Sequence, residues 1–490
     1  MRFRRILSLF VIYVLIGLIT VYTSLLWVGF VREKIYSEEI DFMNPQGTNA
    51  FTQNEGVDPS PTYTHHLSFQ PENRILTGDS LIQTWNQTNI PTREIHLQVF
   101  LRAFGKGEPA PVFNEFMPKV YPGGFSYSSL QLTQVLLDGE PVPYTVENAD
   151  LKLILLKDWK PGEKKEIRIS WKAELPAIHH RMGKEGDSFW FGNALPILAV
   201  YDGKWHSYAY EKAGDPFFSQ FSDYHVEIEY PSRYTLISTG EKEERSEGEK
   251  KIAKVHAEGV REFAFALTAQ HQVVSKLTED GVLLQFYYYK LSKKAAQEGL
   301  DQAEEMLRFM KNLVGEYPYK RLTLFENEMF ISGMEYPGLI LLDRSKYKGE
   351  TVVHEVAHQW FYNLVGNDQV MEPWLDEAIV TYYTDRFIRG SGLNDYYLQI
   401  KKRWEKDGKP KLSSVLGYTT WSQYYRDIYL YGSLMLYELE QKMGREKFND
   451  FMKKYVAEFR GKITHKEDFI RLAEEVSGVN LDSFFSNRIQ

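Results

Sequence analysis

The chain has 490 residues, a formal net charge of -8 at pH 7 and no cysteine. A negative balance offers no basic surface for nucleic acid, so binding to DNA or RNA is not expected. The absence of cysteine excludes disulfides, and a chain of this length can bury enough apolar surface to fold without them.

The first element in chain order is an apolar segment. Residues 6–31 carry no charge and follow Arg2, Arg4 and Arg5. This segment is long enough to span a bilayer, and the three arginines favour a cytoplasmic N-terminus. We therefore expect residues 1–31 to be a retained, single-pass signal anchor of the cell membrane, with the later residues outside the cell. A cleaved signal peptide is the alternative, although its apolar region would be shorter and would end in a small-x-small site.

Three further regions follow the apolar segment. Residues 32–62 are polar and lack sustained periodicity, which is typical of a linker, although the alternative is a helix that continues through Ile40. Residues 63–274 contain short alternating runs, such as 95–101 and 224–230, and indicate a β-rich domain. In residues 275–490, helical patterns at 293–313, 445–459 and 466–476 accompany strands near 322–325 and 339–342. The expected fold class is α+β with several domains, ending in a mixed α/β domain of thermolysin-like pattern.

The most specific motif is His354-Glu355-Val356-Ala357-His358, followed after a gap of eighteen residues by Glu377. Residues four apart on a helix lie about 40° from each other and one turn apart, so both imidazoles can bind one metal ion. Zinc prefers imidazole nitrogen and carboxylate oxygen, and a catalytic zinc keeps one position for water. We expect one Zn²⁺ per chain, bound by His354, His358 and Glu377. Glu355, about 100° around the helix from His354, is placed to take a proton from that water.

The alternative is a pair of structural histidines without metal. The context of the motif argues against it, because residues 352–364 have helical spacing and residues 366–368 supply a stop. Pro373 then opens a second helix, with Glu377 early in it. Two adjacent helices arranged in this way are what the metal site requires.

Three separated blocks resemble the aminopeptidase N and leukotriene hydrolase family of gluzincin zinc metallopeptidases. The family pattern HExxHxWFGN, followed by WLNEGFA, matches residues 354–361 and 374–377. The pattern GxMEN matches residues 332–336, and the pattern Tyr-x-Lys-Gly matches residues 429–432. Weaker similarity extends over most of the chain from about residue 63. The resemblance implies a saddle-like β-rich domain before the catalytic domain, in a short, membrane-anchored form. With no cysteine, a bacterial surface protein fits better than an animal ectodomain.

The chain departs from the family at several positions, none of which is an expected ligand or base. Tyr362 stands where the family has glycine, and Asp376 and Ala378 replace asparagine and glycine. In the GxMEN block, Ser332 and Tyr336 replace glycine and asparagine.

Glu335 lies in the block that resembles GxMEN. A carboxylate at the rim of a zinc site would pair with a free α-amino group, so that cleavage is counted from the N-terminus of the peptide. The alternative is a solvated glutamate on an edge strand. The resemblance also implies a second acid or amide from the N-terminal domain, for which Asn193 is the candidate.

Two more residues have expected roles at the site. The resemblance implies a catalytic tyrosine at Tyr429, whose phenol would donate to the oxyanion of the transition state, with Tyr425 and Tyr431 as competitors. Metal-bound histidines need a partner that fixes their tautomer, and Asp385, on the same helix face as Glu377, is the candidate. The alternative for Asp385 is a surface pair with a neighbouring arginine, Arg386 or Arg389.

The sequence therefore predicts a zinc metallopeptidase, and we expect an aminopeptidase at the outer cell surface that acts on peptides. An endopeptidase with the same centre is one alternative, because Ser332 and Tyr336 depart from the family block. A surface-anchored binding protein of the same fold without turnover is another. The expected partners are peptide substrates and the lipid bilayer.

Overall fold

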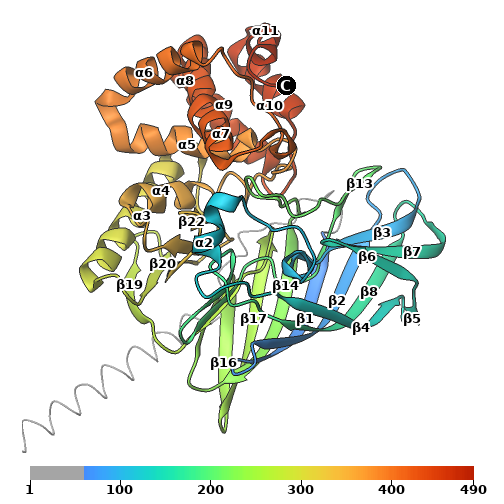
Figure 1. Ribbon diagram of the computed structural model, residues 1–490. Coiled ribbons are helices and arrows are strands. Elements are labelled where there is room, and N and C mark those ends of the chain that lie inside the picture. The colour runs from blue at the N-terminus through green and yellow to red at the C-terminus, as the bar shows by residue number, and fades with distance from the viewer. Residues whose placement is uncertain (1–59) are drawn as a thin grey trace, which may run out of the picture. The chain divides into compact units, whose positions relative to one another are not determined.

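The computed structural model describes residues 60–490 (Figure 1). The predicted anchor at residues 1–31, and the predicted linker up to residue 59, lie outside the described residues. Within residues 60–490, none of the helices has the length and apolar character needed to cross a membrane.

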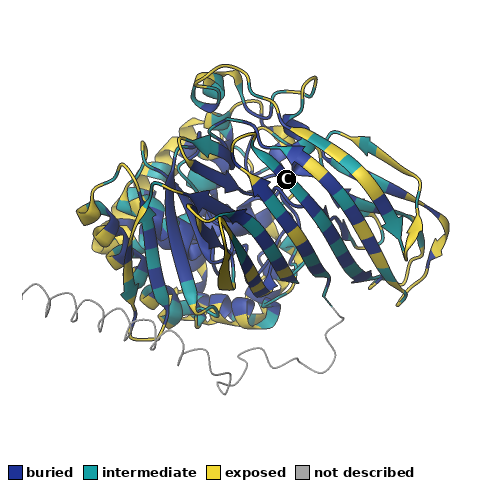
Figure 2. Ribbon diagram, turned by 90° about the horizontal axis from the view of Figure 1, so that it is seen from below, coloured by how far each residue is buried: buried dark blue, intermediate teal, exposed yellow. Residues whose placement is uncertain are grey.

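The first half of the described chain is built around an eight-stranded sheet with the order β16-β17-β14-β1-β2-β8-β4-β5. β1 pairs in parallel with β14 and antiparallel with β2. Buried and more exposed residues alternate along the central strands, seen as bands in Figure 2, so one face of the sheet packs on the core. The strands are β1 (Thr62–Gln70), β2 (Ile75–Trp85), β4 (Ser129–Leu137), β5 (Glu140–Pro141), β8 (Lys164–Glu174), β14 (Ser222–Pro231), β16 (Glu241–Glu247) and β17 (Lys250–Val260).

Smaller sheets complete this β-rich part. One has the order β15-β18-β10-β9, another β11-β3-β7-β6, and β12 pairs with β13. The strands are β3 (Thr92–Gln98), β6 (Tyr144–Glu147), β7 (Asp150–Trp159), β9 (Met182–Glu185), β10 (Ser188–Phe191), β11 (Ile197–Leu198), β12 (Val200–Tyr201), β13 (Trp205–His206), β15 (Thr235–Ser238) and β18 (Phe265–Thr268). Short helices η1 (Phe100–Phe104), η2 (Asn114–Phe116) and α2 (Met117–Val120) lie between β3 and β4.

A five-stranded sheet with the order β19-β20-β21-β23-β22 opens the second half. β21 runs parallel to β20 and β23, and β22 is an antiparallel edge strand. The predicted boundary after residue 274 falls inside β19. The strands are β19 (Gln272–Leu277), β20 (Leu283–Tyr288), β21 (Arg321–Asn327), β22 (Gly333–Met334) and β23 (Leu339–Asp343).

Helices make up the rest of the second half. The helices predicted at 293–313, 445–459 and 466–476 are confirmed as α3, α9 and α10. The helices are α3 (Lys293–Val314), α4 (Gly349–Ala357), α5 (Trp374–Arg389), η3 (Gly390–Gly392), α6 (Leu393–Lys406), η4 (Val415–Gly417), α7 (Trp421–Tyr424), the π-helix η5 (Tyr425–Tyr431), α8 (Gly432–Met443), α9 (Arg445–Phe459), α10 (Lys466–Ser477) and α11 (Asp482–Ser486).

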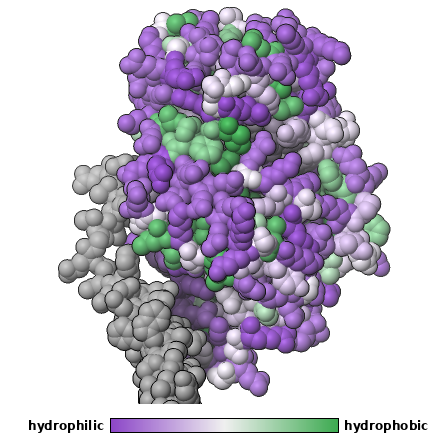
Figure 3. Space-filling model, turned by 90° about the vertical axis from the view of Figure 1, so that its left-hand side faces the viewer, coloured by the Kyte–Doolittle hydropathy of each residue, from purple (hydrophilic) through white to green (hydrophobic). Residues whose placement is uncertain are grey.

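The five-stranded sheet joins the two halves, because the side chains of successive residues point to opposite faces of the sheet and pack in two different hydrophobic cores. Leu339 and Leu341 pack with the β-rich part, whereas Ile340 and Leu342 pack with the helices. The described chain thus combines a β-rich N-terminal part with a mixed α/β part, as predicted. On the face drawn in Figure 3, hydrophilic residues cover most of the described surface, which is usual for a domain in contact with water.

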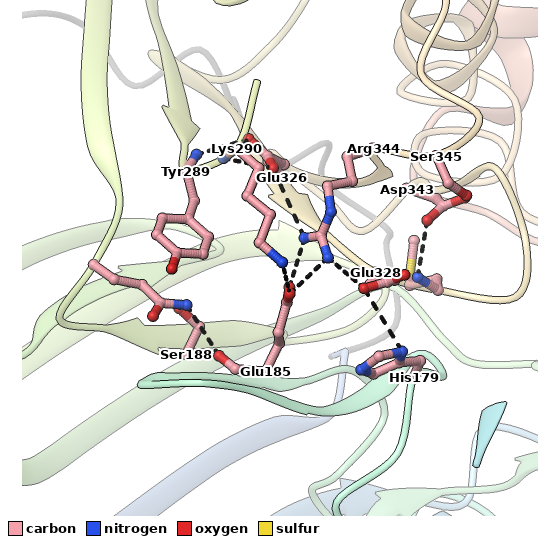
Figure 4. A network of polar contacts seen from close by, with 12 residues as sticks. His179, Glu185, Ser188, Tyr289, Lys290, Glu326, Glu328, Asp343, Arg344 and Ser345 are labelled. Atoms are coloured by element: carbon pink, nitrogen blue, oxygen red, sulfur yellow. Dashed lines mark hydrogen bonds and ion pairs between the residues drawn. The ribbon is translucent and has the colours of Figure 1, made fainter. Parts of the chain in front are cut away.

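A charged network also ties the β-rich part to the mixed part (Figure 4). Arg344, just after β23, donates to both carboxylate oxygens of Glu185 at 2.6 Å, and Lys290 donates to the same carboxylate at 2.7 Å. Glu328 adds a further short contact with Arg344. A bidentate arginine–carboxylate pair has a defined geometry, so this network fixes β9 against the ends of β20 and β23.

Candidate metal centre

Two consecutive helices, α4 and α5, position the predicted metal ligands. α4 carries His354 and Glu355, and His358 is the helical residue directly after it. Pro373 caps the start of α5, and Glu377 lies in its first turn, where the helix dipole favours a carboxylate. The buried valines Val352, Val353 and Val356 hold α4 against the core, and the histidines face α5.

The three predicted ligands come together at one point. Nε2 of His354, Nε2 of His358 and Oε2 of Glu377 form a triangle with every side 3.3 Å long. A tetrahedral zinc site with bonds of about 2.0 Å has ligand-to-ligand edges of about 3.3 Å, so the three atoms match three corners of such a site.

The tautomer of His358 agrees with metal binding. Its Nδ1 lies 3.1 Å from the carbonyl oxygen of Phe361, which can only accept a hydrogen bond. The ring therefore donates from Nδ1, so Nε2 is the nitrogen that faces His354 and Glu377 and that would bind a metal once it has lost its proton. The residues present fit a zinc ion.

Glu355 lies beside this triangle, and its approach depends on a glycine. The carboxylates of Glu355 and Glu335 and a ring nitrogen of His358 lie within 4.8 Å of one another. A Cβ atom on Gly333, in β22, would be 2.3 Å from Oε1 of Glu355. A larger residue at position 333 would therefore displace the Glu355 carboxylate from this place.

The electrostatics of the centre reflect several acids in a buried place. Burial, with a smaller opposing effect of His358, raises the pKa of Glu355 to about 8. Burial also raises the pKa of Glu335 well above its ordinary value. Burial would raise the pKa of Glu377 as well, but His358 and His354 outweigh it and hold that pKa below its usual range. Such a concentration of buried carboxyl groups favours the binding of cations.

Glu335 is buried, with 3% of its surface exposed, so the alternative of a solvated edge-strand glutamate is wrong. Gln369 donates to its Oε1 at 3.4 Å. Its main-chain carbonyl accepts from the amides of Gln359 and Asn363. These contacts hold the carboxyl group beside Glu355 and His358.

Tyr429 is the tyrosine that reaches the centre. Its hydroxyl donates to Oε1 of Glu377 at 2.5 Å, and its ring lies over that of His354 with 5.9 Å between centroids. Of its competitors, Tyr425 is 47% exposed and Tyr431 donates to Asp407. The π-helix η5 presents Tyr429, and π-helical turns are frequent at functional sites.

The side chain of Asn193 bonds to Tyr336, and its role at the substrate N-terminus stays a prediction. It accepts a hydrogen bond at 2.5 Å from the hydroxyl of Tyr336, which neighbours Glu335 in sequence. Among the described hydrogen bonds, none joins Asn193 to Glu335. A positive φ of 54° at Asn193, which asparagine tolerates, directs its side chain toward Tyr336.

The prediction that Asp385 orients a histidine is wrong. Asp385 accepts from Nε of Arg389 at 2.6 Å and from the hydroxyl of Tyr397 at 2.9 Å. It lies eight residues after Glu377, which is about 12 Å along the helix axis and too far from the histidines. The group that accepts from the ring of His358 and orients it is the carbonyl of Phe361.

Sequence reasoning also missed a buried ion pair next to the centre. The carboxylate of Asp215 accepts a hydrogen bond from Nε of Arg181 at 3.0 Å and another from Nη2 of Arg181 at 2.5 Å. Both residues are buried. The Asp215 carboxyl is close enough to the centre to raise the pKa values of Glu335 and Glu355. In the sequence, Gly214-Asp215-Pro216 has only the composition of a turn, so no pattern identified it.

Comparisons with known proteins agree with this geometry. Residues 298–487 match the peptidase family M1 domain. Aminopeptidase B of Rattus norvegicus is 27% identical over 202 residues, which cover 37% of this chain and 31% of that protein. The matched segment thus spans about a third of the length of this relative.

The fold is also similar to that of solved structures. An M1 zinc metallopeptidase from Deinococcus radiodurans matches with a TM-score of 0.64 at 15% identity, covering 88% of this chain and 94% of that one. A mutant of the Deinococcus radiodurans M1 zinc metallopeptidase, bound to a Tyr-Ser-Ala substrate, matches with the same TM-score and identity over 95% of its own length. The chain thus has the fold of these M1 structures, and its residues 298–487 are similar to the peptidase family M1 domain.

Proposed function

We propose that the chain is a zinc-dependent aminopeptidase that hydrolyses the first peptide bond of a peptide with a free N-terminus. The observation that carries the proposal is the triangle of His354, His358 and Glu377, with Glu355 and the buried Glu335 beside it. When bound there, zinc would polarise the scissile carbonyl and lower the pKa of a water molecule. The Tyr-Ser-Ala complex of the structural relative supports a peptide substrate.

Glu355 acts as the general base and then as the general acid. It accepts a proton from the attacking water and returns it to the leaving amine. Its carboxylate lies beside the metal ligands, so the group that takes the proton from the water is also placed to return it to the leaving amine. Glu355 therefore needs no second acid.

Tyr429 stabilises charge on the scissile carbonyl. A rotation of its hydroxyl away from Glu377 would direct the O–H toward the oxygen that becomes negative in the transition state. Tyr429 is partly buried, and a donor held in such a place is effective because fewer water molecules compete with it.

Glu335 makes the enzyme an exopeptidase. A buried carboxylate is unfavourable without a cation, so it gains most from a substrate that carries an α-ammonium group. That ion pair also holds the first peptide bond over the metal ligands. Internal segments of a protein carry no such charge and would bind poorly.

An assay with four substrates tests this proposal against its alternatives. A fluorogenic amino-acid amide, its N-acetylated form, a free peptide and its acetylated form are compared with and without a chelator. An aminopeptidase cleaves only the free forms and loses activity with the chelator. Internal cleavage of acetylated peptides would indicate an endopeptidase, and no turnover on any substrate would indicate a binding protein.

We also infer that the catalytic part acts at the outer face of a bacterial cell membrane, held by residues 1–31. The inference rests on the uncharged run at 6–31 after three arginines. Protease added to intact cells should release a large active fragment cut within residues 32–62. Native protein in the medium that begins after about residue 25 would indicate a cleaved signal peptide instead.

A further inference from the structure

Arg261 directly follows β17 and is 1% exposed, yet its guanidinium group bonds only to main-chain carbonyl groups. Its Nε donates to Tyr362 at 2.8 Å, its Nη1 to Ser219 at 3.0 Å, and its Nη2 to Lys462 and, at 3.5 Å, to Leu364. Among residues 60–490, none of the carboxylates lies within ion-pair distance of it. One side chain of the β-rich part therefore joins three separate segments.

The space around Arg261 is adapted to this group. A Cβ atom on Gly366 would lie 2.1 Å from Cζ of Arg261, so a larger residue there would displace the guanidinium group from this place. Phe221 lies against the guanidinium, with 5.7 Å from Cζ to the ring centroid. Burial lowers the pKa of Arg261 to about 10, which still leaves the side chain charged at neutral pH. Such a charged donor in a buried site binds carbonyl oxygens strongly.

The strongest consequence concerns Tyr362, in the turn after the metal-binding helix. Its φ is 102°, a left-handed value that is unfavourable for a bulky side chain. The surrounding contacts must therefore impose it. The N–H of Tyr362 donates to the carbonyl of Val365 at 2.9 Å, and its carbonyl accepts from Arg261. Both peptide groups next to its Cα atom are thus held.

The peptide group before Tyr362 contains the carbonyl of Phe361, which lies 3.1 Å from Nδ1 of His358. The orientation of that carbonyl depends on the φ of Tyr362, because φ sets the angle between the preceding peptide group and the rest of the residue. The bond from the Tyr362 N–H to Val365 orients this peptide group directly, and the bond from Arg261 to the Tyr362 carbonyl holds the left-handed turn to which the acceptor of His358 belongs.

We propose that Arg261 is a positioning residue of the metal centre, which acts through the main chain of Tyr362 and Phe361 on His358. The proposal rests on the zinc site described above. Partners that orient a metal ligand typically change metal affinity by about 10- to 100-fold when they are lost. Arg261 thereby couples the β-rich part to zinc binding without touching the metal or the substrate.

The test measures the zinc dissociation constant of the full chain by competition with a chromophoric chelator. Arg261→Met should weaken zinc binding by about 10-fold or more, and Arg261→Lys, which keeps one charged donor, should weaken it less. Arg344→Met is the matched control, because Arg344 also joins the two parts of the chain but bonds to Glu185 and not to the turn after α4. It should lower the melting temperature without changing zinc affinity more than about twofold.

A second variant distinguishes the contribution of the Tyr362 main chain to zinc affinity from that of the Tyr362 hydroxyl. Tyr362→Phe keeps the carbonyl that Arg261 holds, so zinc affinity should stay within about twofold. Equal zinc affinity in Arg261→Met and Arg344→Met would overturn the proposal, as would a full loss in Tyr362→Phe. If Arg261→Met does not fold, unchanged affinity in Arg261→Lys would overturn it. Failure of the unaltered chain to bind zinc would instead refute the metal site itself.

Discussion

The hydroxyl of Tyr429 donates a hydrogen bond to Oε1 of Glu377, with 2.5 Å between the two oxygen atoms. The other carboxylate oxygen of Glu377 faces the two histidines. One carboxylate thus connects the catalytic candidate on η5 with the metal ligands on α4, although more than fifty positions separate Tyr429 from Glu377 in the sequence.

Tyr429→Phe removes the donor for the oxyanion but leaves all three ligands in place. We expect kcat to fall by about 10²- to 10³-fold, as on the loss of one oxyanion donor, and zinc content to stay near one per chain. Steady-state kinetics and metal analysis check this. Tyr425→Phe is the control, because Tyr425 is 47% exposed, and it should retain near-normal kcat. A normal rate for Tyr429→Phe would mean that another group stabilises the oxyanion.

Glu335→Ala removes the expected partner of the substrate ammonium group. A charge-assisted contact in a partly dry site contributes about 2–4 kcal/mol, so activity on free dipeptides should fall by about 30- to 1000-fold. Much of the loss should appear in kcat, because the contact also places the scissile bond. Glu305→Ala, at an exposed position on α3, is the control. A nearly silent Glu335→Ala variant would contradict the exopeptidase assignment.

Gly333→Ala tests the close approach of β22 to Glu355. The added methyl group would lie 2.3 Å from Oε1 of Glu355 and must displace the carboxylate. We expect turnover to fall by at least about 10²-fold while zinc remains bound, because general base catalysis typically contributes this much. Gly392→Ala, where no atom lies within 4 Å of the new Cβ, should behave normally. Full activity of Gly333→Ala would show that β22 moves freely.

Glu262 makes stability depend on pH. Burial raises its pKa to about 7, against the opposing effects of Tyr362 and Asn193. The folded state therefore keeps this proton while the unfolded state loses it, so stability falls as pH rises from about 4.5 to 7. The total loss above that window is about 3 kcal/mol.

Glu262→Gln removes this titration while keeping the shape of the side chain. The variant should equal the unaltered chain near pH 4.5 and be more stable at pH 8, as measured by denaturant unfolding at both values. An equal difference in stability at the two pH values would show that the Glu262 carboxyl does not titrate in the folded state.

Side-chain motifs with regular spacing could be predicted from the sequence. His354, His358 and Glu377 follow from a helical repeat and a proline-initiated helix, and they meet as expected. The helix face of Asp385 predicts a bond to a histidine. Its position along the helix axis places it beside Arg389 and Tyr397 instead. The Phe361 carbonyl and the carbonyl partners of Arg261 could not be predicted, because main-chain acceptors are present at every residue and leave no pattern in the sequence.

The most direct measurement of the central claim is zinc content and turnover in Glu355→Gln. This change removes the general base but no metal ligand, so zinc should stay near one per chain while the rate on a free amino-acid amide falls by orders of magnitude. His358→Ala, measured beside it, should lose both the metal and the activity. Loss of zinc from Glu355→Gln, or an unchanged rate with zinc still bound, would contradict the account.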